Sequence, residues 1–112
     1  MMLSESKVDE RRKFERISVP LEAHVFLVDK KNKRLGIVRQ LGRGGMMLEP
    51  VSEFKKGKKY SVFLVEDSEG IRRKLEIVVR RADARQVGCE FVDLAPDAAV
   101  ELGILIGKFY SN

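Results

Sequence analysis

The sequence is poor in the residue types that support covalent or metal chemistry. Among its 112 residues there are one cysteine, one histidine, three prolines and no tryptophan. The single cysteine, Cys89, excludes an internal disulfide framework and is typical of a reducing compartment. The single histidine, His24, has no cysteine or serine partner at the spacing of a catalytic or metal-binding motif. We therefore expect a protein that is not an enzyme and holds neither a metal nor a cofactor.

The chain also lacks a long apolar segment. Its longest apolar-rich run, "VELGILIG", is far shorter than the ~20 residues needed to cross a bilayer, and "MMLSESKVDERRKFER" has no signal-peptide core. We expect a cytoplasmic protein without membrane insertion. The phosphate loop GxxxxGK[ST] is absent, and the glycines of residues 42–45 are not followed by the helix that a dinucleotide fingerprint requires.

Positive charge, by contrast, is in excess. The formal net charge is +5 and the sequence pI is near 9.5, a balance that favours anionic partners. One stretch holds six basic residues and no acidic one, namely Lys30, Lys31, Lys33, Arg34, Arg39 and Arg43. This stretch is locally electropositive.

Alternating apolar and polar residues predict a mainly β protein. A period of two begins at Ser18, and clusters of turn residues separate the later apolar runs. The pattern predicts six strands, at about residues 18–28, 34–40, 46–49, 60–66, 71–81 and 87–94. Strands in hairpin order with short connections indicate one domain, an antiparallel barrel or sandwich.

The two ends of the chain differ from this pattern. Residues 1–16 are mostly polar and predict a flexible arm, which leaves residues 17–112 as the folded domain. A helix is expected at about residues 96–110, because Pro96 suits its first position. Its apolar face is predicted from Val100, Ile104, Leu105 and Phe109. The spacing of Gly103 and Gly107 hints at close approach to a neighbour and leaves monomer and homodimer both open.

The arm carries the first candidate binding motif. In "RRKFER", Arg12 and Arg16 are four residues apart and Arg11 lies beside them, just before the first strand. Arginine presents a planar fork of donors that clamps phosphate or the O6/N7 edge of guanine. RxxxR alone is common and is most often a solvated run of charge.

The setting of this motif resembles the PilZ family of bacterial cyclic di-GMP receptor domains. The resemblance rests on three segments that follow one another along the chain, "RRKFER", "QLGRGGMML" and "GCEFVDLAP", the last of which is followed by the expected helix. It covers roughly residues 10–110. Members carry RxxxR before the first strand and [D/N]xSxxG at the end of the second. The resemblance implies a six-stranded antiparallel barrel of PilZ type with a C-terminal helix, the same strand count as the pattern above predicts.

The resemblance also implies the site residues. Arg12 and Arg16 match the arginines that grip guanine and phosphate in the family, and Gly45 matches the final glycine, where the ligand approaches the backbone. Two positions depart, since Gln40 stands in place of Asp or Asn and Gly42 in place of Ser. Losing an acidic acceptor and a hydroxyl lowers affinity by roughly 10²- to 10³-fold. Arg11, Arg39 and Arg43 are further candidates for contact with phosphate.

Three hypotheses follow for the function. In the first, the chain is a cyclic di-GMP receptor that signals to a downstream protein partner. In the second, it is a degenerate PilZ-like adaptor that acts through protein contacts alone. A third, in which the barrel binds single-stranded nucleic acid, is disfavoured because the chain has no tryptophan and only two tyrosines to stack on bases.

Overall fold

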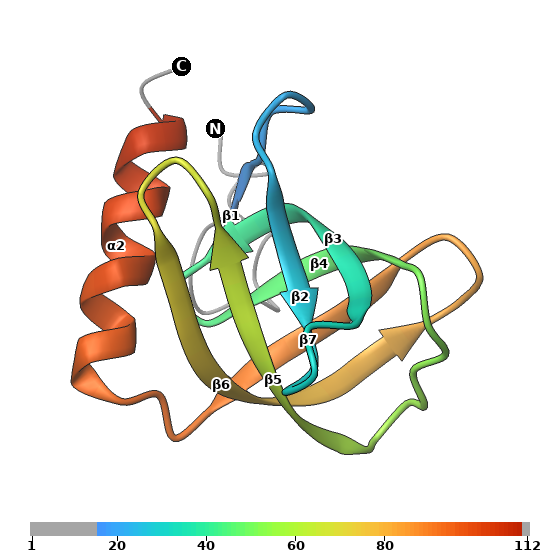
Figure 1. The fold of residues 1–112 in the computed structure, drawn as a ribbon. Coiled ribbons are helices and arrows are strands. Elements are labelled where there is room, and N and C mark those ends of the chain that lie inside the picture. Colours follow the sequence, from blue (N-terminus) through green and yellow to red (C-terminus); the bar gives the residue numbers. More distant parts are fainter. Residues whose placement is uncertain (1–15, 111–112) are drawn as a thin grey trace, which may run out of the picture.

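A closed antiparallel barrel with one helix beside it is formed by residues 16–110, which are the residues that the computed structural model describes (Figure 1). The elements, in chain order, are β1 (Arg16–Ser18), β2 (Val25–Val28), β3 (Arg34–Gly42), β4 (Gly45–Pro50), β5 (Lys59–Glu66), β6 (Ile71–Ala82), β7 (Val87–Val92) and α2 (Pro96–Tyr110). The ring runs β3-β2-β5-β6-β7-β4 and closes where β4 pairs with β3. The predicted six-stranded barrel with a C-terminal helix is confirmed, and β1 is an additional strand.

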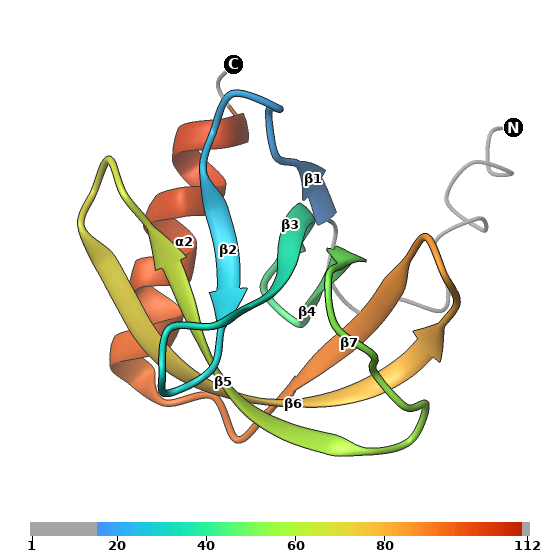
Figure 2. The ribbon, with the colours of Figure 1, turned by 45° about the vertical axis from the view of Figure 1, so that its right-hand side comes forward.

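The prediction of one unbroken strand over residues 18–28 is wrong. The Val19 N–H donates to the carbonyl of Arg39 at 2.8 Å, and Pro20 then has no N–H with which to continue the ladder. A turn follows, in which the Ala23 N–H donates to the Pro20 carbonyl at 3.0 Å. Leu21, predicted to face inward, is therefore 78% exposed. The two pieces, β1 and β2, both pair antiparallel with β3 (Figure 2).

The strands do not all follow hairpin order. Consecutive strands pair from β2 to β4 and again from β5 to β7, but β4 does not pair with β5. Instead β5 pairs with β2, and β4 pairs with both β3 and β7. The hairpin prediction therefore fails at residues 51–58, because that connection carries the chain from one part of the ring to another.

Short polar turns set the hairpins. In the turn between β2 and β3, one Asp29 carboxylate oxygen accepts the N–H groups of Lys31 at 2.8 Å and Lys33 at 2.9 Å. The Lys33 bond is the main cause that lowers the pKa of Asp29. Asn32 has φ 69°, which asparagine tolerates better than most residues. A short side chain thus closes the turn after a strand of apolar residues.

Alternate residues of the long strands fill the barrel. Along β6, Ile71, Leu75, Ile77 and Val79 are all buried, as the pattern predicts. Fully burying a side chain of this size contributes about 1.5–3 kcal/mol. Among residues 16–110, the only buried charged side chain is Glu66, which is 2% exposed.

The helix packs on the barrel through a face that only partly matches the predicted one, since Leu105 and Phe109 are buried as predicted. Its buried residues are Ala98, Leu102, Leu105 and Phe109. Val100 is 63% exposed and Ile104 is 50% exposed, so their assignment to the packed face is wrong. Among residues 16–110, a β-carbon added at Gly103 or Gly107 would meet no atom of a neighbouring element within 4 Å, so the expected close approach to a strand is not found in this part of the chain.

Two polar contacts tie α2 to the strands. The Arg73 Nε donates to Glu101 Oε1 at 2.8 Å, which joins β6 to the middle of the helix. This hydrogen bond is the main cause that lowers the pKa of Glu101. Near the end of the helix, Lys108 Nζ lies 3.7 Å from the buried carboxylate of Glu66 and donates to the hydroxyl of Ser68. Figure 1 shows the helix lying along β6 and the β5–β6 turn.

Candidate functional site

The second arginine of the RxxxR motif lies beside the second motif. In the β1–β3 ladder, Arg16 pairs with Gly42, Ile17 with Leu41, and Ser18 with Gln40. Three of the predicted ligand residues, Arg16, Gln40 and Gly42, therefore share one short ladder. Arg11 and Arg12 lie outside the described residues, so their positions stay predictions.

Gly45 follows the two-residue turn that connects β3 and β4. It pairs with Glu90 of β7, and a β-carbon added to it would lie 2.2 Å from the carbonyl oxygen of Cys89. No real side chain fits at that distance, so the glycine is required for β4 and β7 to approach each other. The carbonyl of the preceding Gly44 accepts the Phe91 N–H at 3.0 Å. The final motif glycine thus has a structural role within the chain itself.

Arg39 is engaged by a carboxylate on the neighbouring strand. Its Nε and Nη2 donate to Oε1 of Glu49 at 3.0 and 2.7 Å. The β3–β4 register shifts between Val38 and Gln40, which makes Arg39 the extra residue of a bulge. A phosphate at Arg39 would have to displace Glu49. The partner was missed from the sequence because the bulge cannot be read from the alternation of residues.

Arg43, in the β3–β4 turn, is exposed. No ion pair joins it to any carboxylate within residues 16–110. With Leu94 and the helix residues Ala99, Val100, Leu102 and Gly103, it lines a cavity of about 320 Å³. Arg43 is consequently the candidate cation that is best placed to meet an incoming anion.

The positive charge of Arg16 affects the pKa of Cys89, the single cysteine of the sequence. Burial raises the pKa of Cys89 to about 12, while the positive charge of Arg16 opposes this shift. Cys89 is 0% exposed and pairs with Met46 of β4 and Val79 of β6. The positive charge of Arg16 therefore reaches the buried thiol, and its backbone pairs with Gly42 of the glycine cluster.

The local chemistry suits an anionic ligand. Arg16 and Arg43 bring two permanent charges to the end of β3, and a guanidinium offers paired donors to phosphate or guanine. Gln40 can accept and donate through its amide, but it carries no charge to oppose the N1 and N2 donors of guanine. The site is therefore more positive than the complete family motif.

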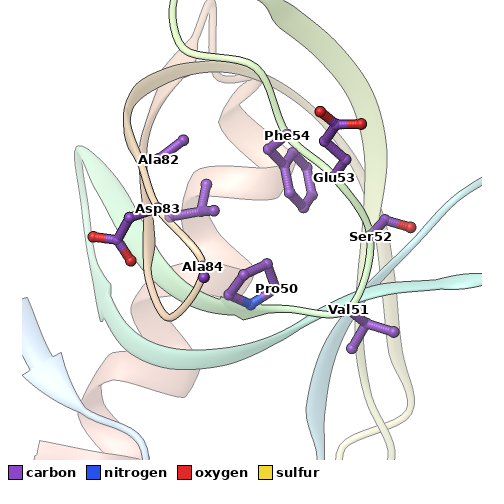
Figure 3. A pocket seen from close by; sticks show the side chains of 9 residues that line it. Pro50, Val51, Ser52, Glu53, Phe54, Ala82, Asp83 and Ala84 are labelled. Atoms are coloured by element: carbon purple, nitrogen blue, oxygen red, sulfur yellow. The ribbon is translucent and has the colours of Figure 1, made fainter.

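Two further cavities lie away from these residues. One, of about 380 Å³, lies between residues 50–54 and the β6–β7 turn, with Pro50 and Phe54 on one side and Ala82 and Ala84 on the other (Figure 3). The other, of about 410 Å³, is lined by His24, Glu66, Lys108 and Phe109, among others. Neither cavity includes a predicted ligand residue.

No group of three or more histidine, cysteine, aspartate or glutamate side chains comes together between residues 16 and 110 in a way that could hold a metal. Within that part of the chain, no helix has the length and apolar character to span a bilayer.

Several solved structures share this fold, and they include complexes with c-di-GMP. The PilZ domain with c-di-GMP of YcgR from Escherichia coli superposes with a TM-score of 0.68 at 18% identity, covering 90% of this chain and 92% of that one. The inhibitor of motility MotI/DgrA of Bacillus subtilis superposes with a TM-score of 0.67 at 18% identity, covering 91% of this chain and 52% of that one. The K. pneumonia MrkH–c-di-GMP complex superposes with a TM-score of 0.65 at 16% identity, covering 90% of this chain and 51% of that one. The chain thus spans about half the length of the latter two proteins.

Sequence comparison agrees with this likeness of fold. Among curated protein sequences none matches the chain. The family model of the PilZ domain, however, matches residues 10–107, which include both arginines of RxxxR and the whole β3–β4 turn. This match extends over most of the chain and coincides with the barrel and helix described above. The chain belongs to the PilZ domain family.

Proposed function

We propose that this chain is a cytoplasmic receptor for cyclic di-GMP that binds through Arg12, Arg16 and the turn of residues 40–45. The observation that carries the proposal is the pairing of Arg16 with Gly42, which brings the RxxxR motif onto the second motif. A planar guanine stacked or clamped by Arg16 would lie against backbone that has no side chain at Gly42. The domain is an effector and not an enzyme, and the bound nucleotide is its signal.

Arg43 supplies the second half of the proposed site. It lies in the two-residue turn that begins directly after Gly42, and it is exposed. A phosphate held between Arg16 and Arg43 would form charge-assisted hydrogen bonds, which are about twice as strong as neutral ones. Arg43 therefore offsets part of the affinity lost at Gln40, because it binds phosphate and not guanine.

A second candidate is an adaptor that has lost the nucleotide and acts through protein contacts. It is favoured by the changed residues at Gln40 and Gly42 and by the engagement of Arg39 with Glu49. Both changes remove groups that recognise the ligand in the family pattern. The two candidates share the barrel and differ only in whether nucleotide binds.

Calorimetric titration with cyclic di-GMP distinguishes them. A receptor binds in the wild type, and Gln40→Asp with Gly42→Ser raises its affinity by roughly 10²- to 10³-fold. An adaptor shows no heat with the wild type at millimolar ligand, whereas the same double substitution creates binding. The variant's thermal unfolding midpoint is compared with that of the wild type, because Gly42 lies in the ladder with β1.

A further inference from the structure

The outer face of β2, β5 and β6 carries an ordered group of cations away from the proposed nucleotide site. We name it the basic sheet face and define it by Lys30, Lys31, Lys33, Arg34, Arg72 and Lys74. All six side chains are exposed. The lysines of residues 30–33 belong to the β2–β3 turn, and the other three come from β3 and β6.

Strand register places the strand residues on one face. Phe26 of β2 pairs with Val65 of β5, which pairs with Arg72 of β6. In the neighbouring row, Phe63 of β5 pairs with Lys74 of β6. These side chains are half-buried or exposed, while the alternating residues of the same strands fill the core. The two rows therefore form a continuous outer surface.

Two arginines on this surface are held in place by aromatic rings. The Arg34 Cζ lies 3.7 Å from the centre of the Phe26 ring, and the Arg72 Cζ lies 4.4 Å from the centre of the Phe63 ring. Arg72 also donates through Nη1 to Asn32 Oδ1 at 2.6 Å. Contact with the face of a ring leaves guanidinium N–H groups available, and the restricted side chain loses less entropy on binding.

The positive charge of this face is compensated only in part, by Asp29, whose carboxylate interacts electrostatically with Lys31 and Lys33. Lys74 lies 4.0 Å from Glu76, but no carboxylate within residues 16–110 forms an ion pair with the other five cations. The nearby Asp29 carboxylate is hydrogen-bonded within its own turn, to the N–H groups of Lys31 and Lys33. An isolated barrel gains little from such a cluster, whereas a negatively charged partner would be attracted to it.

We propose that the basic sheet face is a docking surface for an acidic segment of a partner protein. Each guanidinium can bind a carboxylate with two parallel hydrogen bonds. Nucleic acid fits less well, because the rings of Phe26 and Phe63 are already covered by guanidinium groups and offer no open platform to a base.

This inference does not depend on nucleotide binding. The cations of the basic sheet face come from the β2–β3 turn, the first residue of β3, and β6, whereas the proposed nucleotide site lies on β1, the end of β3 and the β3–β4 turn. An adaptor without nucleotide would keep the same docking surface. The two proposals therefore fail or succeed separately.

The test uses the full chain without nucleotide and a short fluorescent peptide of alternating glutamate and serine. Binding is followed by fluorescence anisotropy at about 50 mM salt, and it should weaken strongly at about 200 mM. Arg34→Glu with Arg72→Glu should reduce affinity about tenfold or more. Lys55→Glu with Lys56→Glu, which changes the net charge equally at exposed residues of another loop, should have a much smaller effect.

A conservative variant distinguishes the contribution of the guanidinium hydrogen bonds to peptide binding from the contribution of positive charge alone. Arg34→Lys with Arg72→Lys keeps the charge but removes the bidentate donors, and it should weaken peptide binding about threefold. The proposal is overturned by any of three results: no binding of the acidic peptide to the wild type, equal losses in the two charge-reversal variants, or tighter binding of a single-stranded oligonucleotide than of the peptide.

Discussion

Arg16 pairs directly with Gly42 in the ladder between β1 and β3. In sequence the two residues belong to separate motifs, and only folding makes them neighbours. The pairing depends on β1, a strand of only three residues. It pairs with the end of β3, whereas β2 pairs with the beginning of β3. The short strand therefore carries the arginine next to the glycine of the second motif.

Gly45→Ala should destabilise the protein by about 1–3 kcal/mol or more, because its β-carbon would overlap the Cys89 carbonyl oxygen at 2.2 Å. This overlap can be relieved only if the paired strands β4 and β7 move apart. The free energy of unfolding, measured in urea, checks this prediction.

Gly103→Ala is the matched control for that substitution. It adds the same methyl group on the helix, where nothing lies within 4 Å, and should stabilise the protein by about 0.5–1 kcal/mol. If both alanine variants have the same stability, the structural role assigned to Gly45 is wrong.

Glu66→Gln should cost about 1–3 kcal/mol at neutral pH. Burial acts to raise the pKa of Glu66, but hydrogen bonds from Ser68 and from the Glu69 N–H, together with the charge of Lys108, outweigh burial and lower it. The ionised carboxylate therefore stabilises the fold above its unfolded pKa of about 4.5, and this contribution is lost as the pH falls through the lower folded value.

Chemical denaturation of both proteins from neutral to acidic pH measures this effect. The gap in stability between wild type and Glu66→Gln should narrow as the pH falls below about 4.5. Glu69→Gln, which removes an exposed carboxylate 3.4 Å from Lys108, should cost no more than about 1 kcal/mol. A gap that stays constant with pH would show that Glu66 does not stabilise the fold as an anion.

Cys89 should be unreactive in the folded protein. Its thiol is 0% exposed and burial raises its pKa to about 12, so at pH 8 only about one molecule in ten thousand carries the thiolate. A thiol-specific chromogenic reagent should react with it only after denaturant is added. Rapid labelling of the native protein would contradict the burial of β7 in the barrel.

The barrel could be predicted because its strands alternate regularly and end at strong turn residues. The break at Pro20 was missed, because Leu21 continues the period of two although its side chain lies in a turn. The face of α2 was misjudged for a related reason. Apolar residues surround most of this helix, so periodicity cannot tell whether Leu102 or Val100 faces the barrel.

The positions of the two motifs in the candidate site could be predicted from the sequence. The contacts that their residues make in the fold could not. RxxxR and the glycine cluster can be recognised from residue type and spacing alone. The ion pair of Arg39 with Glu49 and the close approach of Gly45 to Cys89 depend on a bulge and on strand order. Those features arise only when distant segments meet, and they decide which candidate groups are still available to a ligand.

The most direct test of the proposed receptor is calorimetric titration of cyclic di-GMP into the wild type and into Arg12→Ala with Arg16→Ala. The wild type is expected to bind and the double variant to show no measurable heat, because both predicted guanidinium clamps are gone. Arg80→Ala, which removes an arginine paired with Glu90 at 3.0 Å, serves as the control and should bind like the wild type. Full affinity in the Arg12 and Arg16 variant would contradict the proposed site.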